Sequence, residues 1–279
     1  MTIAFASGKG GTGKTTFSVA FALSADEDVT FLDCDVEAPN SHFFIKPEIK
    51  LKEEITVPVP VVDNNKCTGC GICAKVCRFS AITMLVSKPL MVHELCHSCG
   101  GCTIACPENA ISEIQSEIGV ISSGTRDHIT FYQGQLDVGS VKSPPLIRAV
   151  KRKGEGADLV MIDCPPGTSC PMVTTVTGAD YAVLVTEPAP FGLNDLKIAV
   201  ETVRILGIPF GVVINKSDHP FPQTEEYCKS ESIPVLLRLP ENRAAAEGCS
   251  SGESIITIFP GLQDKIKNAI KTIKKEAVR

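Results

Sequence analysis

Short, continuous apolar runs alternate with longer stretches of mixed apolar and polar residues at both ends of this chain. Such short runs are typical of buried strands, and the mixed stretches after them are typical of helices. The alternation predicts an α/β protein with a doubly wound, mostly parallel sheet. The expected strands are Thr2–Ala6, Val29–Asp33, Leu159–Asp163, Tyr181–Thr186, Gly211–Asn215 and Val235–Leu239. The clearest expected helices are Thr16–Ala25, Pro145–Lys153 and Leu262–Arg279.

This alternation of strand-like and helix-like segments stops at about Lys50. Val57–Val62 looks extended and carries two prolines, and a cysteine-rich stretch follows it. Strand-like content returns at Ile129–Tyr132 and again at Gln135–Val138. We therefore expect a discontinuous α/β domain formed by residues 1–57 and 116–279, with a small inserted domain at residues 58–115.

Bulk properties exclude several classes of protein. The net charge of −5 offers no electrostatic reason to expect nucleic acid as a partner. No apolar run approaches the roughly 20 residues that span a bilayer, and the first residues do not resemble a secretory leader. Disulfides would require an oxidising compartment, so the 13 cysteines are expected to stay reduced or to bind metal in the cytoplasm.

The stretch Gly8–Thr15 reads Gly-Lys-Gly-Gly-Thr-Gly-Lys-Thr and lies between an expected strand and an expected helix. This pattern is typical of a loop whose backbone N–H groups surround nucleotide phosphates. Lys14 would reach the terminal phosphates, and the Thr15 hydroxyl would hold Mg²⁺. The expected ATP/ADP-binding residues of this loop are Gly8, Gly10, Gly11, Thr12, Gly13, Lys14, Thr15 and Thr16.

A looser dinucleotide-binding pattern also fits Gly8, Gly10 and Gly13. That interpretation leaves Lys14 and Thr15 without a role, and Asp33 would be its sole support. Triphosphate binding is the better prediction.

A second lysine, Lys9, directly follows the first glycine. With it, the loop resembles the deviant phosphate loop of the MinD/ParA family of ATPases, which have the P-loop NTPase fold. The resemblance implies that Lys9 crosses a dimer interface to the partner's nucleotide. It also implies a slow ATPase, stimulated when the chain pairs on ATP binding with itself or with a similar ATPase. A solvated loop lysine is the alternative.

Acidic residues follow two of the expected strands. Asp33 and Asp35 follow one, and Asp163 opens the string Asp-Cys-Pro-Pro-Gly, which ends at Gly167. Carboxylates placed in this way can orient water or hydrated Mg²⁺. By resemblance to the same family, Asp35 would position the attacking water with support from Asp33, Asp163 would hold Mg²⁺ through water, and Gly167 would sense the γ-phosphate.

Asn215-Lys216-Ser217-Asp218 resembles the loop beside the base in that family, so Asn215 is expected to contact adenine. The looser Asn-Lys-x-Asp pattern would instead suggest guanine in a GTPase. Lys9 favours ATP.

Eight cysteines occur in two copies of the spacing C-x2-C-x2-C-x3-C. This run holds a [4Fe–4S] cluster, with the fourth cysteine of each copy serving the other cluster. Structural zinc sites, the main alternative, usually pair two Cys-x-x-Cys knuckles across a longer gap. The expected ligand sets are Cys67, Cys70, Cys73 and Cys106 for the first cluster, and Cys96, Cys99, Cys102 and Cys77 for the second.

Residues Val59–Gln115 resemble a bacterial two-cluster ferredoxin, which implies a small α+β fold and a redox partner protein. Arg78 departs from that family's pattern, because a proline usually follows the fourth cysteine. A segment this short and poor in large apolar side chains is expected to need its clusters to fold.

Two further features have competing interpretations. Cys170 lies seven residues after Asp163, at the spacing of a cluster ligand in the nitrogenase iron protein, but we favour a small buried thiol. The tail has Leu262, Ile266, Ile270 and Ile273 at helical spacing, and we favour a packing helix over a membrane-binding one.

The whole chain thus resembles MinD-like ATPases with an inserted ferredoxin domain. The leading hypothesis is a nucleotide-gated electron-transfer component. One alternative is an iron–sulfur cluster carrier of the Mrp type, although the Cys-x-x-Cys pair that such carriers have near the C-terminus is missing. Another is an ATPase that positions a partner complex.

Overall fold

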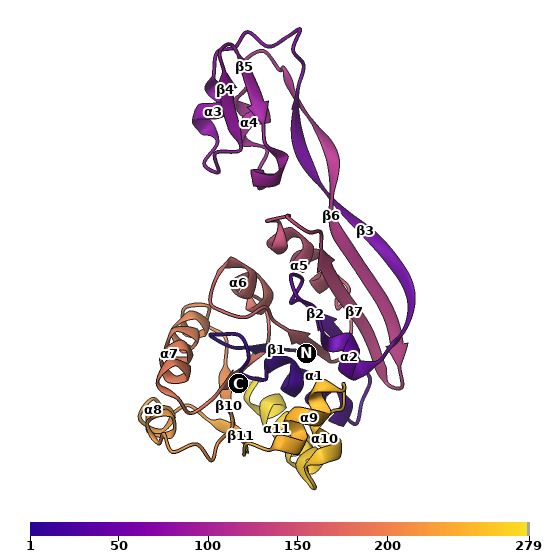
Figure 1. Ribbon diagram of the computed structural model, residues 1–279, viewed down its shortest axis with the longest axis vertical. Helices are drawn as coiled ribbons and strands as arrows, with labels where there is room; N and C mark the ends of the chain where they lie inside the picture. The colour runs from indigo at the N-terminus through magenta and orange to yellow at the C-terminus, as the bar shows by residue number, and fades with distance from the viewer. Residues whose placement is uncertain (278–279) are drawn as a thin grey trace. The chain divides into compact units, whose positions relative to one another are not determined.

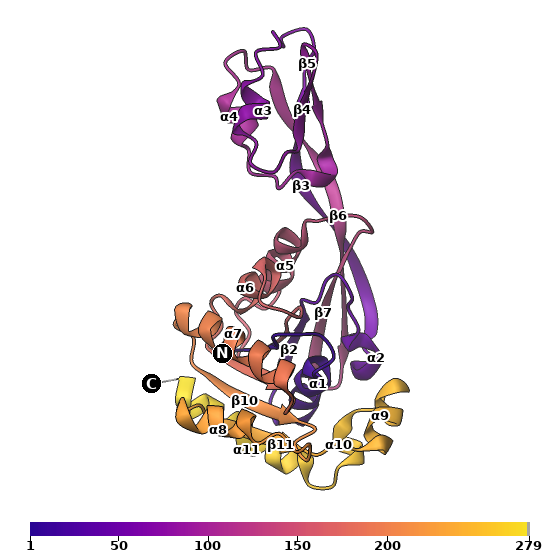
Figure 2. The same ribbon diagram turned by 60° about the vertical axis from the view of Figure 1, so that its left-hand side comes forward.

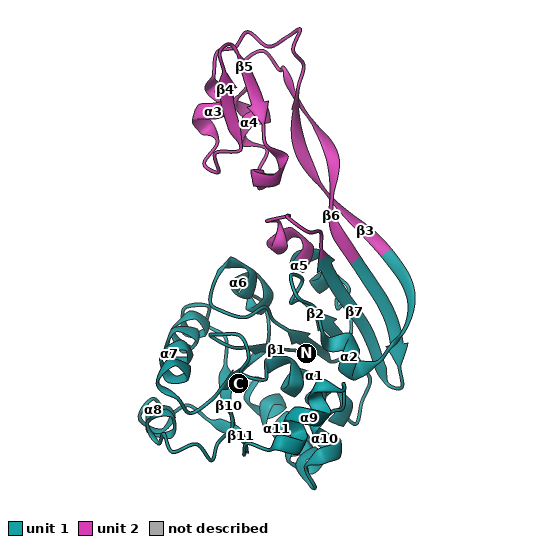
Figure 3. Ribbon diagram, in the orientation of Figure 1, with its two compact units in different colours: residues 1–52, 121–135, 147–279 teal, residues 53–120, 136–146 magenta. Residues whose placement is uncertain are grey.

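The structure is a computed structural model that describes residues 1–277. The chain forms two compact units, coloured separately in Figure 3. Unit 1 comprises Met1–Lys52, Ile121–Gln135 and the described residues from Ile147 onward, and unit 2 comprises Glu53–Val120 and Leu136–Leu146. The expected insert at 58–115 therefore falls inside a unit that also includes a segment after residue 135.

A nine-stranded sheet forms the framework of unit 1 (Figure 1). The strand pairs among β1, β2 and β7 to β11 are parallel, which confirms the expected mostly parallel α/β sheet. In sheet order the strands are β11 (Val235–Leu239), β10 (Phe210–Asn215), β9 (Tyr181–Thr186), β1 (Thr2–Ala6), β8 (Val160–Asp163), β2 (Val29–Asp33), β7 (Ile129–Leu136), β6 (Ile111–Arg126) and β3 (Glu48–Val62).

The central strands of this sheet are buried on both faces. In β1, Ile3 and Phe5 on one face and Ala4 and Ala6 on the other are all inaccessible to solvent. This explains why the strands read as continuous apolar runs. The helices of this α/β framework (Figure 2) are α1 (Lys14–Ser24), α2 (Ser41–Ile45), α5 (Ser143–Arg152), α6 (Cys170–Val176), α7 (Pro190–Ile205), α8 (Gln223–Ser230), α9 (Arg243–Ser250), α10 (Ile255–Ile258) and α11 (Leu262–Ala277).

Several expected boundaries differ from the structure, and two of these differences have a clear physical reason. The strands expected at Ile129–Tyr132 and Gln135–Val138 are one strand, β7, because Gln133 continues the parallel register opposite Asp33. The first helix begins at Lys14, two residues earlier than expected, because Gly13 turns the chain with a φ of 93°.

Unit 2 is built on two long strands that the sequence pattern predicted only in part. β3 and β6 are neighbours in the nine-stranded sheet, and both run from unit 1 into unit 2. The elements between them are α3 (Ile72–Val76), β4 (Ile82–Leu85), β5 (Lys88–Met91), the short 3₁₀ helix η1 (His93–Leu95) and α4 (Gly101–Ala105), with β4 and β5 antiparallel.

The C-terminal helix α11 packs against the sheet of unit 1. Leu262, Ile266, Ile270 and Ile273 are all buried in the same apolar cluster as β1 and α1, as a packing helix requires. Residues 278 and 279, the end of the expected helix, lie outside the described residues. Among residues 1–277, no helix combines the length and apolar character needed to cross a membrane.

Candidate functional site

The loop between β1 and α1 has a backbone that only glycine adopts easily. Gly11 and Gly13 have φ values of 79° and 93°. At Gly8, an added Cβ would lie 2.4 Å from the backbone oxygen of Asp195, so α7 packs too closely for any side chain. The Thr12 hydroxyl is buried and has no hydrogen-bond partner among the described residues. An unsatisfied polar atom inside this loop fits a site that is completed by a polar ligand.

Lys14 and Thr15, at the start of α1, both contact Asp163 at the end of β8. Lys14 Nζ donates to Asp163 Oδ1 at 3.1 Å, and Thr15 Oγ1 donates to Asp163 Oδ2 at 2.6 Å. The Asp35 carboxylate lies 3.9 Å from Lys14 Nζ. Burial lowers the pKa of Lys14, but the Asp163 and Asp35 carboxylates more than offset it and raise the pKa overall. These groups fit MgATP, because the Lys14 ammonium can bind phosphate and the Thr15 hydroxyl and Asp163 carboxylate can bind the metal.

Asp33 is fully buried beside Asp163, because β2 and β8 are parallel and these residues are in register. Its carboxylate accepts hydrogen bonds from the backbone N–H groups of Asp35, at 3.2 Å, and Ser41, at 3.0 Å. Burial and then the Asp163 charge raise its pKa to about 7, while burial raises the pKa of the more accessible Asp35 to about 6. Asp33 therefore braces the turn that carries Asp35.

Lys9 forms an ion pair with Glu187, which directly follows β9. Glu187 also lies 3.4 Å from Lys216 Nζ. Burial raises the pKa of Glu187, but the two lysines have the larger combined effect and lower it overall. Glu187 was not identified from the sequence. Its position directly after a buried strand, like that of Asp35 and Asp163 near strand ends, could have indicated that it lies near the phosphate loop. In this conformation, Lys9 is held within its own chain.

Asn215 and Gly167 also hydrogen-bond within the chain. Asn215 Nδ2 donates to the Thr12 carbonyl at 3.0 Å, and the Gly167 N–H donates to the Ser7 carbonyl at 3.0 Å. Asn215 also lines a hollow of about 210 Å³ that is partly open to solvent. Other residues lining this hollow are Gly11, Gly13, Thr16, Phe17, Pro240 and Asn242. The hollow thus brings phosphate-loop residues together with the segment that follows β11.

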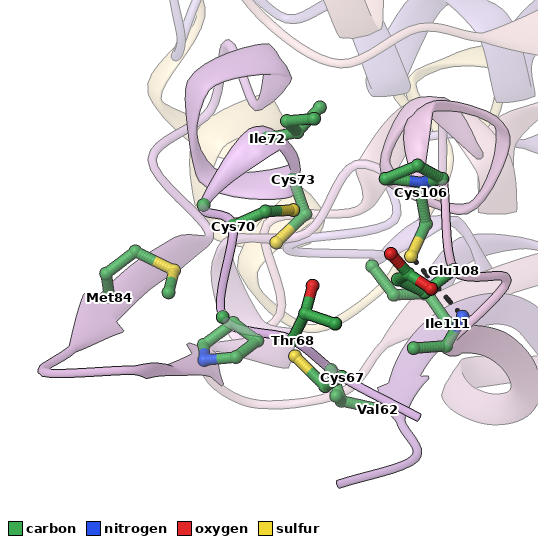
Figure 4. A pocket seen from close by; sticks show the side chains of 15 residues that line it. Val62, Cys67, Thr68, Cys70, Ile72, Cys73, Met84, Cys106, Glu108 and Ile111 are labelled. Atoms are coloured by element: carbon green, nitrogen blue, oxygen red, sulfur yellow. Dashed lines mark hydrogen bonds between the residues drawn. The ribbon is translucent and has the colours of Figure 1, made fainter. Parts of the chain in front are cut away.

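One pocket of unit 2 is lined by Cys67, Cys70, Cys73 and Cys106 (Figure 4). Cys67 and Cys70 come from the loop that leads into α3, Cys73 lies in the first turn of α3, and Cys106 directly follows α4. Cys106 Sγ accepts the Ala110 N–H at 3.3 Å. The same pocket includes Gly69, where an added Cβ would lie 2.3 Å from the Ser87 carbonyl oxygen. Burial raises the pKa of the Cys73 thiol, so a bound metal would be needed to hold it as thiolate.

A second pocket is lined by Cys96, Cys99, Cys102 and Cys77. Its loop repeats the geometry of the first, since Gly71 and Gly100 each follow a cysteine, have φ values of 73° and 70°, and precede a short helix. Cys96 Sγ accepts the Ser98 N–H at 3.4 Å.

No group of three or more Cys, His, Asp or Glu side chains in the part of the chain that the structure describes is arranged to hold one metal ion. A [4Fe–4S] cluster binds each cysteine through a different iron, so its ligands do not converge on one point. The two four-cysteine pockets fit that requirement by residue type and number.

The remaining cysteines separate by exposure. Cys34, Cys164 and Cys228 are buried, and Cys249 is half-buried. Cys170 is exposed, so the favoured interpretation of a buried thiol was wrong. Cys170 is the first residue of α6, and the residues of this helix that are buried, Met172, Thr175 and Val176, come after it.

The phosphate loop follows the first strand of a parallel sheet, and its lysine and threonine contact an aspartate at the end of another strand. This arrangement defines a P-loop nucleotide-binding protein. The family model CbiA, the CobQ/CobB/MinD/ParA nucleotide binding domain, matches residues 3–255. The chain belongs to this family.

Several known proteins are similar to the chain along most of its length. It is 33% identical over 279 residues to the uncharacterized protein MJ0578 of Methanocaldococcus jannaschii, covering 97% of this chain and 98% of that one. It is 25% identical to the cytosolic Fe-S cluster assembly factor NBP35 of Eremothecium gossypii, covering 91% and 68%. The septum site-determining protein MinD of Pyrococcus horikoshii, solved with Mg-ADP, aligns with a TM-score of 0.58 at 22% identity, covering 98% and 96%. The last likeness concerns the fold.

Proposed function

We propose that this chain is an ATP-hydrolysing iron–sulfur protein that transfers electrons to or from a partner protein under the control of its nucleotide state. The observation that carries the proposal is that one chain combines a complete phosphate loop with two four-cysteine pockets. Two complete cysteine sets suit retention of clusters better than their donation. Keeping these thiols reduced suits a cytoplasmic location.

In unit 1, we assign Lys14 to the terminal phosphates and Thr15 with Asp163 to Mg²⁺. Asp35 is the assigned water-positioning group, because it lies close to Lys14 and is more accessible than Asp33. Bound clusters would supply one-electron carriers, and the eight cysteines would hold them in the two sets described above.

We further propose that Lys9 acts across a dimer, in a second copy of this chain or in a similar ATPase. Its ion pair with Glu187 would then have to open when the partner's nucleotide arrives.

Replacing Lys9 by alanine tests this role. A cationic group supplied in trans is worth about 10³–10⁵ in rate in related phosphoryl transfers, so Lys9→Ala should lower ATP hydrolysis by a factor in that range. Lys66→Ala, at an exposed lysine of unit 2, serves as the control and should leave the rate unchanged. A normal rate in Lys9→Ala would exclude the cross-dimer role.

Anaerobic redox titration followed by EPR tests the coupling of the two units. Iron and sulfide content first establishes whether the clusters are bound. A midpoint potential or spin coupling that changes between the apo, ADP and MgATP states would support gating. Identical titrations in all three states would leave two independent modules on one chain.

A cluster carrier is the second candidate, supported by the 25% identity to the assembly factor NBP35. Against it, Cys228 and Cys249 do not form a Cys-x-x-Cys pair near the C-terminus. The two candidates are separated by mixing the iron-loaded protein with an apo-acceptor. ATP-dependent transfer of iron and sulfide would favour the carrier, and retention would favour electron transfer.

A further inference from the structure

Each four-cysteine pocket has a lysine hydrogen-bonded to the backbone at the start of its cysteine loop or in the turn just before it. At the first pocket, Lys88 Nζ donates to the carbonyl oxygens of Asn64, at 2.7 Å, and Cys67, at 3.1 Å. At the second pocket, Lys142 Nζ donates to the His93 carbonyl oxygen at 2.9 Å. The two loops are therefore supported by the same kind of contact.

The two lysines differ in burial. Lys88 is exposed, whereas only 5% of the surface of Lys142 is accessible. Lys142 also comes from outside the expected insert, from the segment between β7 and α5. A chain stretch that follows a strand of the nucleotide-binding sheet thus places a buried cation in unit 2.

The contact made by Lys142 is directly linked to a cysteine. The same His93 carbonyl oxygen accepts the backbone N–H of Cys96 at 3.1 Å, so the ammonium and this N–H share one acceptor. The His93 ring nitrogen Nε2 lies 2.8 Å from the carbonyl oxygen of Pro60, which lines the second pocket. His93 thereby ties Lys142, the Cys96 loop and the pocket wall together.

A buried positive charge acts strongly on a nearby redox group. Reduction adds a negative charge, and a cation in a low-dielectric surrounding stabilises that charge more than an exposed cation that is screened by water and salt. Charge and hydrogen bonding around the ligand sulfurs are recognised determinants of iron–sulfur potentials. Lys142 is such a buried cation beside a cysteine loop, whereas Lys88 is exposed and its charge is screened.

We propose that Lys142 is a positioning residue that orients the Cys96 loop and raises the reduction potential of the cluster held by Cys77, Cys96, Cys99 and Cys102. This inference rests on the proposed function, since it requires that clusters are bound. It extends that function by assigning the potential of one cluster to a residue outside the cysteine motifs.

The test compares the full-length, iron-loaded protein with Lys142→Met, Lys142→Arg and Lys88→Met by anaerobic EPR redox titration. Lys142→Met should shift one midpoint to more negative potential and leave the other in place. Lys142→Arg should keep the wild-type value because it retains the charge, and Lys88→Met should shift its midpoint less. Loss of about half of the iron in Lys142→Met alone, restored in Lys142→Arg, would also support the proposal.

Unchanged midpoints in Lys142→Met with full iron content would overturn the proposal. Equal shifts or equal iron loss in Lys142→Met and Lys142→Arg would overturn it too, because charge would not be the cause. Absence of iron and sulfide from the wild-type protein would refute the proposed function itself, and the iron assay reports that outcome separately.

Discussion

The two units of this protein are stabilised by different means. Unit 1 buries a large apolar cluster that includes Phe5, Phe31 and Phe131 on the sheet and α1 and α11 above it. Around the cysteines of unit 2, one buried cluster comprises only Cys73, Ile82 and Ile111, and several of the partly buried residues packed against it are themselves cysteines. Apolar burial can stabilise the first unit by itself, whereas a core this small needs a bound metal or cross-links.

Among the changes that test this difference between the units, removing iron should have the largest effect on stability. Chelation under anaerobic conditions should abolish hydrogen-exchange protection across residues 63–110, between β3 and β6, because the small core cannot hold its loops without the clusters. Unit 1 should keep its stability. The chain has three tyrosines, Tyr132, Tyr181 and Tyr227, all in unit 1, so tyrosine fluorescence follows that unit alone.

Protection of residues 63–110 after complete iron removal would mean that the small cluster of Cys73, Ile82 and Ile111 suffices as a core. A simultaneous loss of the tyrosine signal would mean that the units unfold together.

Truncating one core residue in each unit should have an intermediate effect. Phe131 is inaccessible and stacks on Phe31 with ring centroids 6.0 Å apart, so Phe131→Ala should lower the free energy of unfolding of unit 1 by about 3–5 kcal/mol. Ile82→Ala in unit 2 should cost about 2 kcal/mol, at the low end for such a change, because few apolar neighbours surround Ile82. Urea unfolding monitored by tyrosine fluorescence and by iron–sulfur absorbance measures both.

Phe191→Ala is the control for this pair, since Phe191 is 79% exposed on α7 and should change stability by less than about 0.5 kcal/mol. A larger loss of stability for Ile82→Ala than for Phe131→Ala would reverse the comparison.

The smallest expected effect concerns pH and unit 1. In the folded protein, the pKa of Asp33 is about 7, above its ordinary value of about 3.9, so the folded state binds more protons between these values. The stabilisation from this group is complete below the lower value and is lost as pH rises through the upper one. The free energy of unfolding should therefore fall by up to about 1.4 kcal/mol per pH unit in this window.

Asp33→Asn should remove this slope from the tyrosine-monitored unfolding of the nucleotide-free protein. The difference in slope between variant and wild type is the measurement, because groups remote from Asp33 and Asp163 contribute equally to both. Parallel pH profiles would show that Asp33 ionises in the folded state as it does in the unfolded chain.

Local patterns in the sequence predicted the parallel α/β sheet, most of its strands and the phosphate loop. Continuous apolar runs identify strands buried on both faces, and glycines with Lys14 and Thr15 identify a loop whose chemistry lies within eight consecutive residues. The cysteine spacing likewise predicted which cysteines belong together, and the structure places Cys67, Cys70, Cys73 and Cys106 around one pocket. These features depend on residues close together in the chain or on a fixed repeat.

Tertiary structure alone decided which distant groups meet. Glu187 pairs with Lys9 across 178 positions, Ser41 donates its N–H to Asp33, and Lys142 reaches the loop of Cys96. It also exposed Cys170 and joined two expected strands into β7. None of these has a local signature, because they follow from the register of strands and the packing of helices. Sequence spacing determines which groups can bind a ligand, and the fold determines which charges surround them.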